Sequence, residues 1–297
     1  MYTILISILC GGAVGTALGL SDATSPFWAV TWGVLATVAT YAIALFLLNR
    51  ALRSRMESVQ GILLEGQRQM QARVKRYESR PGTDPRQAMR EMEASSQKVL
   101  RAALENSSVL EPFIGWIPLM SRQIATMRMQ FHYQLKEFDK VDALLPRCLV
   151  LDPLSASMKL AQRWRAKATS AEIRKEFDKM GPRLKYNQSV LPYSLMAWIY
   201  VQEALAAEAE ARKAPQDRKA EIEARRAAAE ENAHQILIRA CRDNEHETLN
   251  RNRDRLANRK LREFTNAGLA DQWYALFLET PKIQQRRVMP RMDGRPF

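Results

Sequence analysis

Charged side chains are almost absent from the first part of this chain. Between Met1 and Asn49 the sequence has no lysine, arginine, glutamate or histidine and a single aspartate, Asp22, whereas all 45 lysines and arginines lie from Arg50 onward. The whole chain has a formal net charge of +13, so the part after Asn49 carries +14 once the charge of Asp22 is set aside. This asymmetry predicts a membrane anchor followed by a water-exposed region.

Cysteines, histidines and glycine-rich loops are also scarce, which excludes several kinds of site. The three cysteines lack CxxC spacing, so we expect no disulfide framework. His246 begins a sequence like the zinc motif HExxH, but Asn250 replaces the second histidine and leaves a metal without its ligand pair. Neither GxxxxGK[ST] nor GxGxxG after a strand occurs. We therefore expect no catalytic residue, no cofactor and no metal, and a protein that is not an enzyme.

Two apolar segments lie on either side of Asp22. The second, Phe27–Leu48, contains no charged residue. At 1.5 Å rise per residue, a helix of this length spans roughly 33 Å, enough to cross a hydrocarbon core of about 30 Å. The first, Ile4–Leu20, is near the lower limit of about 17 residues for a spanning helix. We expect the two segments to form a transmembrane helical hairpin.

Aromatic and basic residues predict the orientation of this hairpin. Trp28 and Trp32 lie at one end of the second segment, where aromatic side chains anchor at the headgroup level. Arg50, Arg53 and Arg55 follow the other end, and positive residues close to a span stay on the cytoplasmic side. The sequence therefore predicts a multi-pass protein of a bacterial inner (cytoplasmic) membrane, with both termini and the large domain in the cytoplasm.

Small residues predict how the two segments pack. Gly11, Gly15 and Gly19 recur at intervals of four and form one groove on a helix. Such grooves let backbones approach closely in lipid, where apolar burial does not drive helices together. The second segment has a similar small-residue face, made of Gly33, Ala36, Thr37, Thr40 and Ala44. Packing within the hairpin is the simplest interpretation, and homo-oligomeric packing through the same glycines is the alternative.

A cleaved signal is another interpretation of the first segment. A secretory signal has a basic region before its apolar run, and none precedes Ile4. A lipoprotein signal has a small residue before its cysteine, whereas Leu9 precedes Cys10. We therefore expect a retained span and an unmodified thiol.

A heptad-like seam follows the second span. Its members are Leu52, Met56, Val59, Leu63, Gly66, Met70 and Tyr77. This spacing predicts that the helix continues out of the membrane and pairs with another helix, although a glycine costs about 1 kcal/mol relative to alanine. Three partners fit the seam: a second copy of the chain, the protein's own helical body, or lipid.

A break and an apolar corner come next. The sequence Pro81-Gly82-Thr83-Asp84-Pro85 predicts a turn, with Asp84 capping a helix that runs from Pro85 to about Glu105. The segment from Val109 to Met120 is apolar but contains two prolines and a glycine, which forbid a long regular helix. It is either a buried corner or a surface that meets the membrane interface or a partner through Phe113 and Trp116.

The next region resembles a known helical repeat. After a helical run from Gln123 the chain has Phe138-Asp139-Lys140-Val141, Leu145, Cys148-Leu149 and Leu151-Asp152-Pro153. This order resembles one tetratricopeptide repeat (TPR), over residues 123–153, whereas Arg128-Met129, Val141 and Pro146 depart from the family pattern. The resemblance implies paired amphipathic helices that stack on neighbours and bind proteins.

Further helix pairs are expected at 155–168 with 171–180, at 192–212 with 216–242, and at 247–259 with 260–280. In the middle pair, one helix should face the other through Leu195, Trp198, Leu205 and Ala209 on one side and Ile222, Ala229, Ala233 and Ile236 on the other. Alternating strand patterns are absent, so the fold class is all-α. The expected regions are a transmembrane hairpin (1–49), a juxtamembrane coiled-coil-like helix (50–82), a cytoplasmic helical repeat domain (83–281) and a basic tail (282–297).

One charge pattern is a candidate binding surface. Its residues are Arg251, Arg255, Arg259 and Arg262, spaced to lie on one helical face, and the tail adds five basic residues. Such a stripe suits an acidic protein, anionic lipid headgroups or nucleic acid, and a solvated face is the simplest alternative. The absence of interleaved aromatic residues and of a nucleic-acid motif argues against nucleic acid.

These features together predict a membrane-anchored helical-repeat scaffold or adaptor that recruits a protein partner at the cytoplasmic face. The partner's identity does not follow from the sequence. The alternative is a noncatalytic structural subunit of a larger membrane complex, assembled through its spans and juxtamembrane helix.

Overall fold

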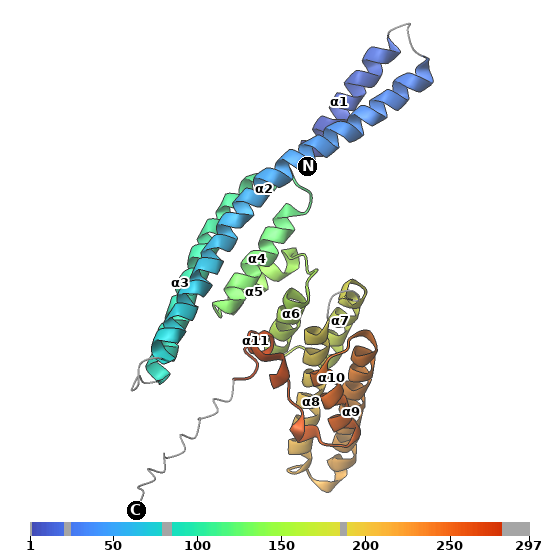
Figure 1. The fold of residues 1–297 in the computed structure, drawn as a ribbon. Coiled ribbons are helices and arrows are strands. Elements are labelled where there is room, and N and C mark those ends of the chain that lie inside the picture. The colour runs from blue at the N-terminus through green and yellow to red at the C-terminus, as the bar shows by residue number, and fades with distance from the viewer. Residues whose placement is uncertain (1, 21–24, 79–84, 185–188, 281–297) are drawn as a thin grey trace, which may run out of the picture. The chain divides into compact units, whose positions relative to one another are not determined.

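Helices form all of the regular secondary structure in the residues that the computed structural model describes, which are 2–20, 25–78, 85–184 and 189–280 (Figure 1). The predicted all-α class is therefore confirmed. The chain divides into two compact units, Met1–Val150 and Leu151–Phe297. This division cuts across the ranges expected from the sequence, because the TPR-like segment falls almost entirely in the first unit.

The first unit begins with two helices packed along each other, α1 (Tyr2–Gly19) and α2 (Pro26–Glu78) (Figure 1). Both are long and apolar enough to cross a membrane. Helix α2 has 53 residues and continues without interruption from the apolar segment through the heptad-like seam. The residues of the predicted turn at 81–84, including the Asp84 cap, lie outside the described residues.

The seam of α2 packs against the protein's own helices. These are α3 (Pro85–Asn106) and α4 (Met120–Gln134). Val59 is buried with Leu100 and Phe131, and Leu63 packs on the same cluster. The seam residues Leu52 and Met56 contact a second cluster around Leu110. Of the three partners considered from the sequence, the body of the protein is therefore the one that covers this face of α2.

Two glycines of α2 have different environments and give a matched test of this packing. A Cβ on Gly66 would overlap Val99 Cγ1 on α3, whereas a Cβ on Gly61 has nothing within 4 Å. Gly61→Ala should stabilise the protein by up to about 1 kcal/mol through helix propensity. Gly66→Ala gains the same propensity but adds overpacking of about 1–3 kcal/mol. We expect a lower melting temperature for Gly66→Ala than for Gly61→Ala in detergent; equal values would contradict packing of α2 on α3.

After α4, the first unit ends with two short elements, α5 (Phe138–Leu144) and the 3₁₀ turn η2 (Leu145–Arg147). The helix pair predicted at 123–153 is therefore present as α4 and α5, but its second helix has only seven residues. Pro146 explains the early end, because its missing N–H cannot continue an α-helical ladder. The resemblance to a tetratricopeptide repeat stays a prediction.

The second unit surrounds one central helix, α8 (Val190–Ala211). Around it lie α6 (Pro153–Arg165), α7 (Ser170–Leu184) and α9 (Gln216–Asp243) (Figure 1). Every residue from Val190 to Val201 is buried, so this part of α8 is the core of the unit.

Helices α8 and α9 form the antiparallel pair expected from the sequence, with one shift of register. Leu195, Ile222 and Ala233 are buried as predicted. Leu205 is only half-buried and Ala209 is exposed, whereas Ala204 and Ala207 are fully buried. A row of alanines therefore lets the two helices approach at this end of the pair.

In the last predicted pair, the second helix, expected at 260–280, is not formed. Helix α10 (Glu247–Ala257) is followed by two 3₁₀ turns, η3 (Leu261–Glu263) and η4 (Ala267–Leu269), and by the short α11 (Ala270–Tyr274). Arg259 has φ 57°, and the Lys260 N–H donates to Arg255 O at 2.8 Å, which closes the helix end.

Side-chain hydrogen bonds then hold the segment after α10 in its irregular path. The buried Asn252 side chain donates to Thr265 O at 2.9 Å and to Asn266 Oδ1 at 3.1 Å. The Asn266 side chain in turn donates to Ser194 O on α8 at 3.2 Å. These side-chain hydrogen bonds, two of them to backbone carbonyls, take the place of the helical ladder that the sequence pattern suggested.

Candidate functional site

The three glycines singled out in α1 all face α2. A Cβ on Gly11 would overlap Thr37 and lie 2.5 Å from Gly33 O; one on Gly15 would lie 3.6 Å from Gly33 Cα, and one on Gly19 would lie 3.8 Å from Ala29 Cβ. The two backbones approach most closely at Gly11. The glycine groove is therefore occupied within the hairpin, which is the simpler of the two packings considered from the sequence.

The buried residues of the hairpin are small or polar, whereas most of its large apolar side chains are exposed. Thr3, Ser7, Gly11, Ala29 and Gly33 are buried. Only 17% of the apolar window of α1 and 6% of that of α2 is buried. Large side chains that are exposed include Ile4, Leu5, Ile6, Ile8, Leu9 and Val14 on α1, and Phe27, Trp28, Val30, Trp32, Val34, Leu35, Val38, Ile43, Phe46 and Leu47 on α2.

This pattern of burial is the reverse of that in a water-soluble pair of helices. A soluble protein buries its large apolar side chains, and contiguous exposed apolar patches of more than a few hundred Å² are rare in soluble monomers. Thr37 and Thr40 donate their hydroxyl hydrogens to carbonyls one turn earlier, Gly33 O and Ala36 O, which satisfies them without water. The arrangement matches the chemistry of a surface solvated by lipid.

The four predicted arginines do not share one helical face. Arg251 and Arg255 lie on α10, whereas Arg259 follows the end of that helix and Arg262 lies in η3. Two of them are ion-paired, Arg251 with Glu247 and Arg262 with Glu208. The expectation of a continuous helical stripe is therefore wrong, because α10 ends at Ala257. Binding by these arginines stays a prediction, and the basic tail lies outside the described residues.

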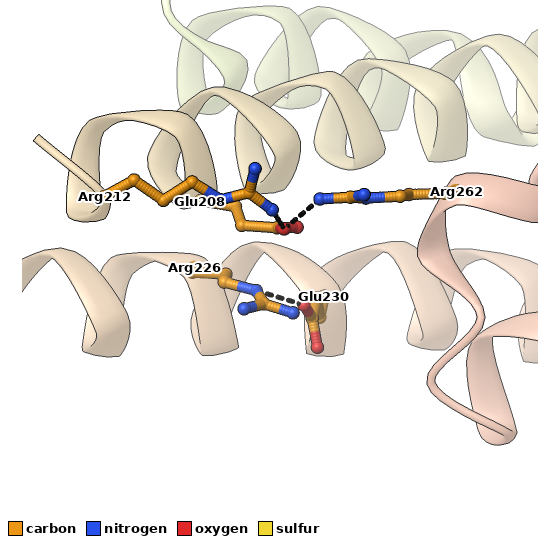
Figure 2. Close-up of polar contacts among 5 residues, drawn as sticks. All are labelled: Glu208, Arg212, Arg226, Glu230 and Arg262. Carbon is orange, nitrogen blue, oxygen red and sulfur yellow. Dashed lines mark hydrogen bonds and ion pairs between the residues drawn. The ribbon is translucent and has the colours of Figure 1, made fainter.

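Arg262 belongs to an ion cluster that joins η3 to α8 and lies beside an ion pair on α9. Figure 2 shows Arg212 and Arg262 reaching the carboxylate of Glu208 from opposite sides, and an Arg226–Glu230 pair on the neighbouring helix. Arg212 is 2.6 Å from Glu208 Oε1, and Arg226 is 2.7 Å from Glu230 Oε1. Arg212 lies four residues after Glu208 at the end of α8, whereas Arg262 meets Glu208 only because the turn after α10 brings η3 back to α8.

The ion cluster changes the acidity of Glu208. The hydrogen bond from Arg262 lowers the pKa of this carboxyl, and Arg212 and the nearby charge of Arg226 act in the same direction, against a smaller opposing effect of burial. A lowered folded-state pKa contributes stability above the unfolded pKa, about 4.3, and the contribution is lost as the pH falls through the folded value.

Glu208→Gln should therefore change the acid sensitivity of the protein. Glutamine cannot titrate, so we expect the melting temperature of Glu208→Gln to lie below that of the wild type at neutral pH and the difference to shrink below about pH 4. Arg262→Gln should remove most of the same pH-dependent contribution. Thermal unfolding in detergent from pH 7 to pH 3 measures both; a difference that does not vary with pH would contradict the ion cluster.

A groove lies beside this cluster. It has a volume of about 660 Å³ and is lined by α9 and by the end of α10, with Arg226, Glu230, His234 and Arg259 among its polar side chains. Glu223 and Glu231 also line it. Because the groove carries charges of both signs, it suits a protein or peptide surface of mixed charge better than a phosphate.

Two of the three histidines, His132 and His246, have structural contacts, and His234 lines the groove. His246 is the N-cap of α10 and its Nδ1 accepts from the Thr248 N–H at 3.2 Å, so the HExx sequence begins a helix instead of lying along one. His132 Nδ1 lies 2.7 Å from Glu137 Oε2. Among the described residues no group of three His, Cys, Asp or Glu side chains is placed to hold a metal ion.

Comparison with known proteins gives no family. The chain matches no protein-family model, and no curated protein or solved structure is significantly similar to it.

Proposed function

We propose that this protein is a membrane-anchored helical scaffold. Helices α1 and α2 insert in the inner (cytoplasmic) membrane as a two-span hairpin, and the remaining helices recruit a protein partner at the cytoplasmic face without bond-making chemistry. The observation that carries the proposal is the reversed burial of the hairpin, in which Gly11 and Gly33 are inside while Leu9 and Phe46 are 72% and 68% exposed. Lipid is the solvent in which such a surface is stable.

The groove between α9 and the end of α10 is the proposed partner site. Arg259 lines the groove, and Arg255 lies on α10, four residues before it. The ion pair with Glu208 is made by Arg262 and not by these two arginines. A partner with both acidic and basic groups would meet this surface, because glutamates and arginines line the groove together. Its binding should weaken with salt, since exposed charges are screened beyond about 8 Å at physiological ionic strength.

Cysteine accessibility tests the anchor and its orientation. The native Cys10, Cys148 and Cys241 are first replaced by serine. In this background Ser25→Cys shows on which side of the membrane the turn between the two spans lies. Ser108→Cys shows the side of the opposite end of the hairpin. Both positions are exposed. A membrane-impermeant maleimide should label Ser25→Cys in cells with a permeabilised outer membrane, and Ser108→Cys only after lysis. Labelling of both before lysis would contradict a two-span anchor.

Capture experiments test the scaffold. The full-length protein, solubilised in mild detergent, should retain a partner that Arg255→Glu with Arg259→Glu releases, whereas the matched double change Arg218→Glu with Lys219→Glu near the start of α9 should retain it. Equal retention by the two variants would remove the groove from the proposal.

A second candidate function rests on apolar side chains left exposed beyond the proposed span. Leu64 and Val74 on α2 and Met89 on α3 are 55%, 38% and 50% exposed. They lie outside the packed seam and favour the alternative, a structural subunit that assembles into a larger membrane complex through its juxtamembrane helix. Oligomerisation lost in Leu64→Glu with Val74→Glu would favour this function over the scaffold.

A further inference from the structure

The apolar corner between α3 and α4 is attached to the first turn of α1. The corner comprises the 3₁₀ turn η1 (Ser107–Phe113) and the residues up to Met120. The Tyr2 N–H donates to Gly115 O at 2.9 Å, and the Thr3 hydroxyl donates to Trp116 O at 2.7 Å. These two bonds join segments more than one hundred residues apart in the chain. Figure 1 shows the corner beside the end of α1 where the chain begins.

Aromatic rings reinforce the attachment. The rings of Tyr2 and Trp116 lie 5.5 Å apart with an interplanar angle of 60°, a tilted arrangement that is favourable for aromatic pairs. Gly115 is required for this approach, because a Cβ there would lie 2.6 Å from Tyr2 Cε2. Trp116 is 39% exposed and Tyr2 is 58% exposed, so the pair is open to its surroundings on one side.

The corner divides its apolar residues between two environments. Leu110 is fully buried, and Phe113 and Ile117 pack on the same cluster with Leu52 of α2. Ile114, Trp116 and Leu119 instead remain 42%, 39% and 52% exposed. The sequence had left a buried corner and an exposed surface as alternatives, and each half of the corner corresponds to one of them.

The backbone of Leu119 has an unfavourable conformation. It has φ 63° and ψ 2°, in the left-handed region that non-glycine residues rarely adopt. A leucine in this conformation costs roughly 1 kcal/mol or more relative to glycine. A bulky apolar side chain that is both strained and exposed indicates a role outside the packing of the isolated chain.

The register of the hairpin fixes the level of the corner. Gly11 lies opposite Gly33 and Thr37, and Gly19 lies opposite Ala29. Continued to the start of α1, this antiparallel register places Tyr2 beside the helical turn of α2 that contains Phe46. This turn lies at the end of the apolar segment. Trp116 is bonded to α1 at this same end, close to the arginines that begin at Arg50.

We propose that Ile114, Trp116 and Leu119 form a third membrane contact, which inserts in the headgroup and upper acyl region of the cytoplasmic leaflet beside the hairpin. This inference rests on the proposed two-span anchor. The occupant is the bilayer, because the exposed side chains are continuous with the apolar surface of the hairpin through Tyr2. Aromatic side chains at the end of a span are those that anchor at the headgroup level. The contact fixes the first unit against the membrane surface.

Depth-dependent quenching tests the contact. A nitrobenzoxadiazole probe is attached to Ile114→Cys, to Leu35→Cys in the middle of the apolar segment, or to Ala143→Cys on the exposed face of α5, each in the background with the native cysteines replaced by serine. The full-length proteins are reconstituted in vesicles of phosphatidylethanolamine and phosphatidylglycerol at three to one. Lipids with a doxyl group at acyl carbon 5 or carbon 12 are the quenchers.

We expect the carbon-5 lipid to quench the probe at Ile114 at least twofold more than the carbon-12 lipid does. The probe at Leu35 should show the opposite preference. The probe at Ala143 should be quenched by neither lipid. Quenching at Leu35 without quenching at Ile114 would overturn the contact and leave the anchor standing. Absence of quenching at Leu35 would overturn both. As a label-free measurement, Trp116→Phe should lower the fraction of tryptophan emission quenched by the carbon-5 lipid; an unchanged fraction would also overturn the contact.

Discussion

Gly11→Ala is expected to separate α1 from α2 in part, whereas Gly12→Ala, one residue away, should have no such effect. A Cβ on Gly11 would overlap Thr37 Oγ1 and lie 2.5 Å from Gly33 O, while a Cβ on Gly12 has nothing within 4 Å. The Thr37 side chain cannot rotate away without losing its hydrogen bond to Gly33 O, and the Gly33 carbonyl belongs to the backbone of α2. The helices must therefore move apart.

The cost of this movement is large for a single methyl group. Overpacking of a well-packed interface costs about 1–3 kcal/mol, and loss of the close approach also removes van der Waals contacts along the groove, which are the main attraction between helices in lipid. We expect Gly11→Ala to lower the melting temperature of the detergent-solubilised protein and to increase hydrogen exchange in α2 around Gly33. Gly12→Ala should neither lower the melting temperature nor increase this exchange, because it adds no overlap.

The same pair of variants separates the two packings of the glycine groove. If the groove served homo-oligomers, Gly11→Ala would change the oligomeric state in detergent at constant hairpin stability. Packing within the hairpin predicts the reverse, a loss of hairpin stability at constant oligomeric state. Equal behaviour of Gly11→Ala and Gly12→Ala in every measurement would contradict the close approach of α1 and α2.

Trp273→Ala is expected to be the most destabilising single change in the second unit. Trp273 is fully buried, its ring lies 5.7 Å from that of Trp198 on α8, and Trp198 in turn lies 6.0 Å from Trp164 on α6. Removing a buried tryptophan side chain costs about 3–5 kcal/mol. The change also removes one of two indole donors to Glu279, whose carboxylate accepts from Trp198 at 2.6 Å and from Trp273 at 2.8 Å.

Phe277→Ala is the matched control for this prediction. Phe277 lies four residues further along the same segment but is 37% exposed, so its truncation should change the free energy of unfolding by less than about 1 kcal/mol. Chemical denaturation of the full-length protein in detergent, followed by tryptophan fluorescence, compares the two. Similar midpoints for Trp273→Ala and Phe277→Ala would show that residues 270–280 do not close the core of the second unit.

The sequence predicted the two apolar helices α1 and α2, because their signals are local. Charge depletion identifies an apolar segment without reference to the fold, and glycines four residues apart share a face on any helix. The seam from Leu52 to Tyr77 was harder to interpret, since an apolar face looks the same whether it meets a second copy, lipid or the same chain. Contacts of Val59 with Leu100 and Phe131 decide this, and they depend on tertiary structure.

The end of the second unit could not be predicted from periodicity. The pattern from Lys260 to Thr280 allows a helix, but the buried side chains of Asn252 and Asn266 hydrogen-bond to each other and to backbone carbonyls and hold an irregular path. The meeting of Arg262 with Glu208 follows from that path. An asparagine in a charged helix gives no sign in the sequence that it is 1% exposed.

Extraction with alkaline carbonate tests the central proposal, that α1 and α2 lie in the membrane, most directly. Membranes from cells that produce the full-length protein are washed at high pH, which removes proteins held only by charge and retains those whose apolar surface is in the lipid. The reversed burial of the hairpin predicts that the protein stays with the membrane pellet. Its recovery in the supernatant would contradict the proposal and, with it, the scaffold function and the third membrane contact.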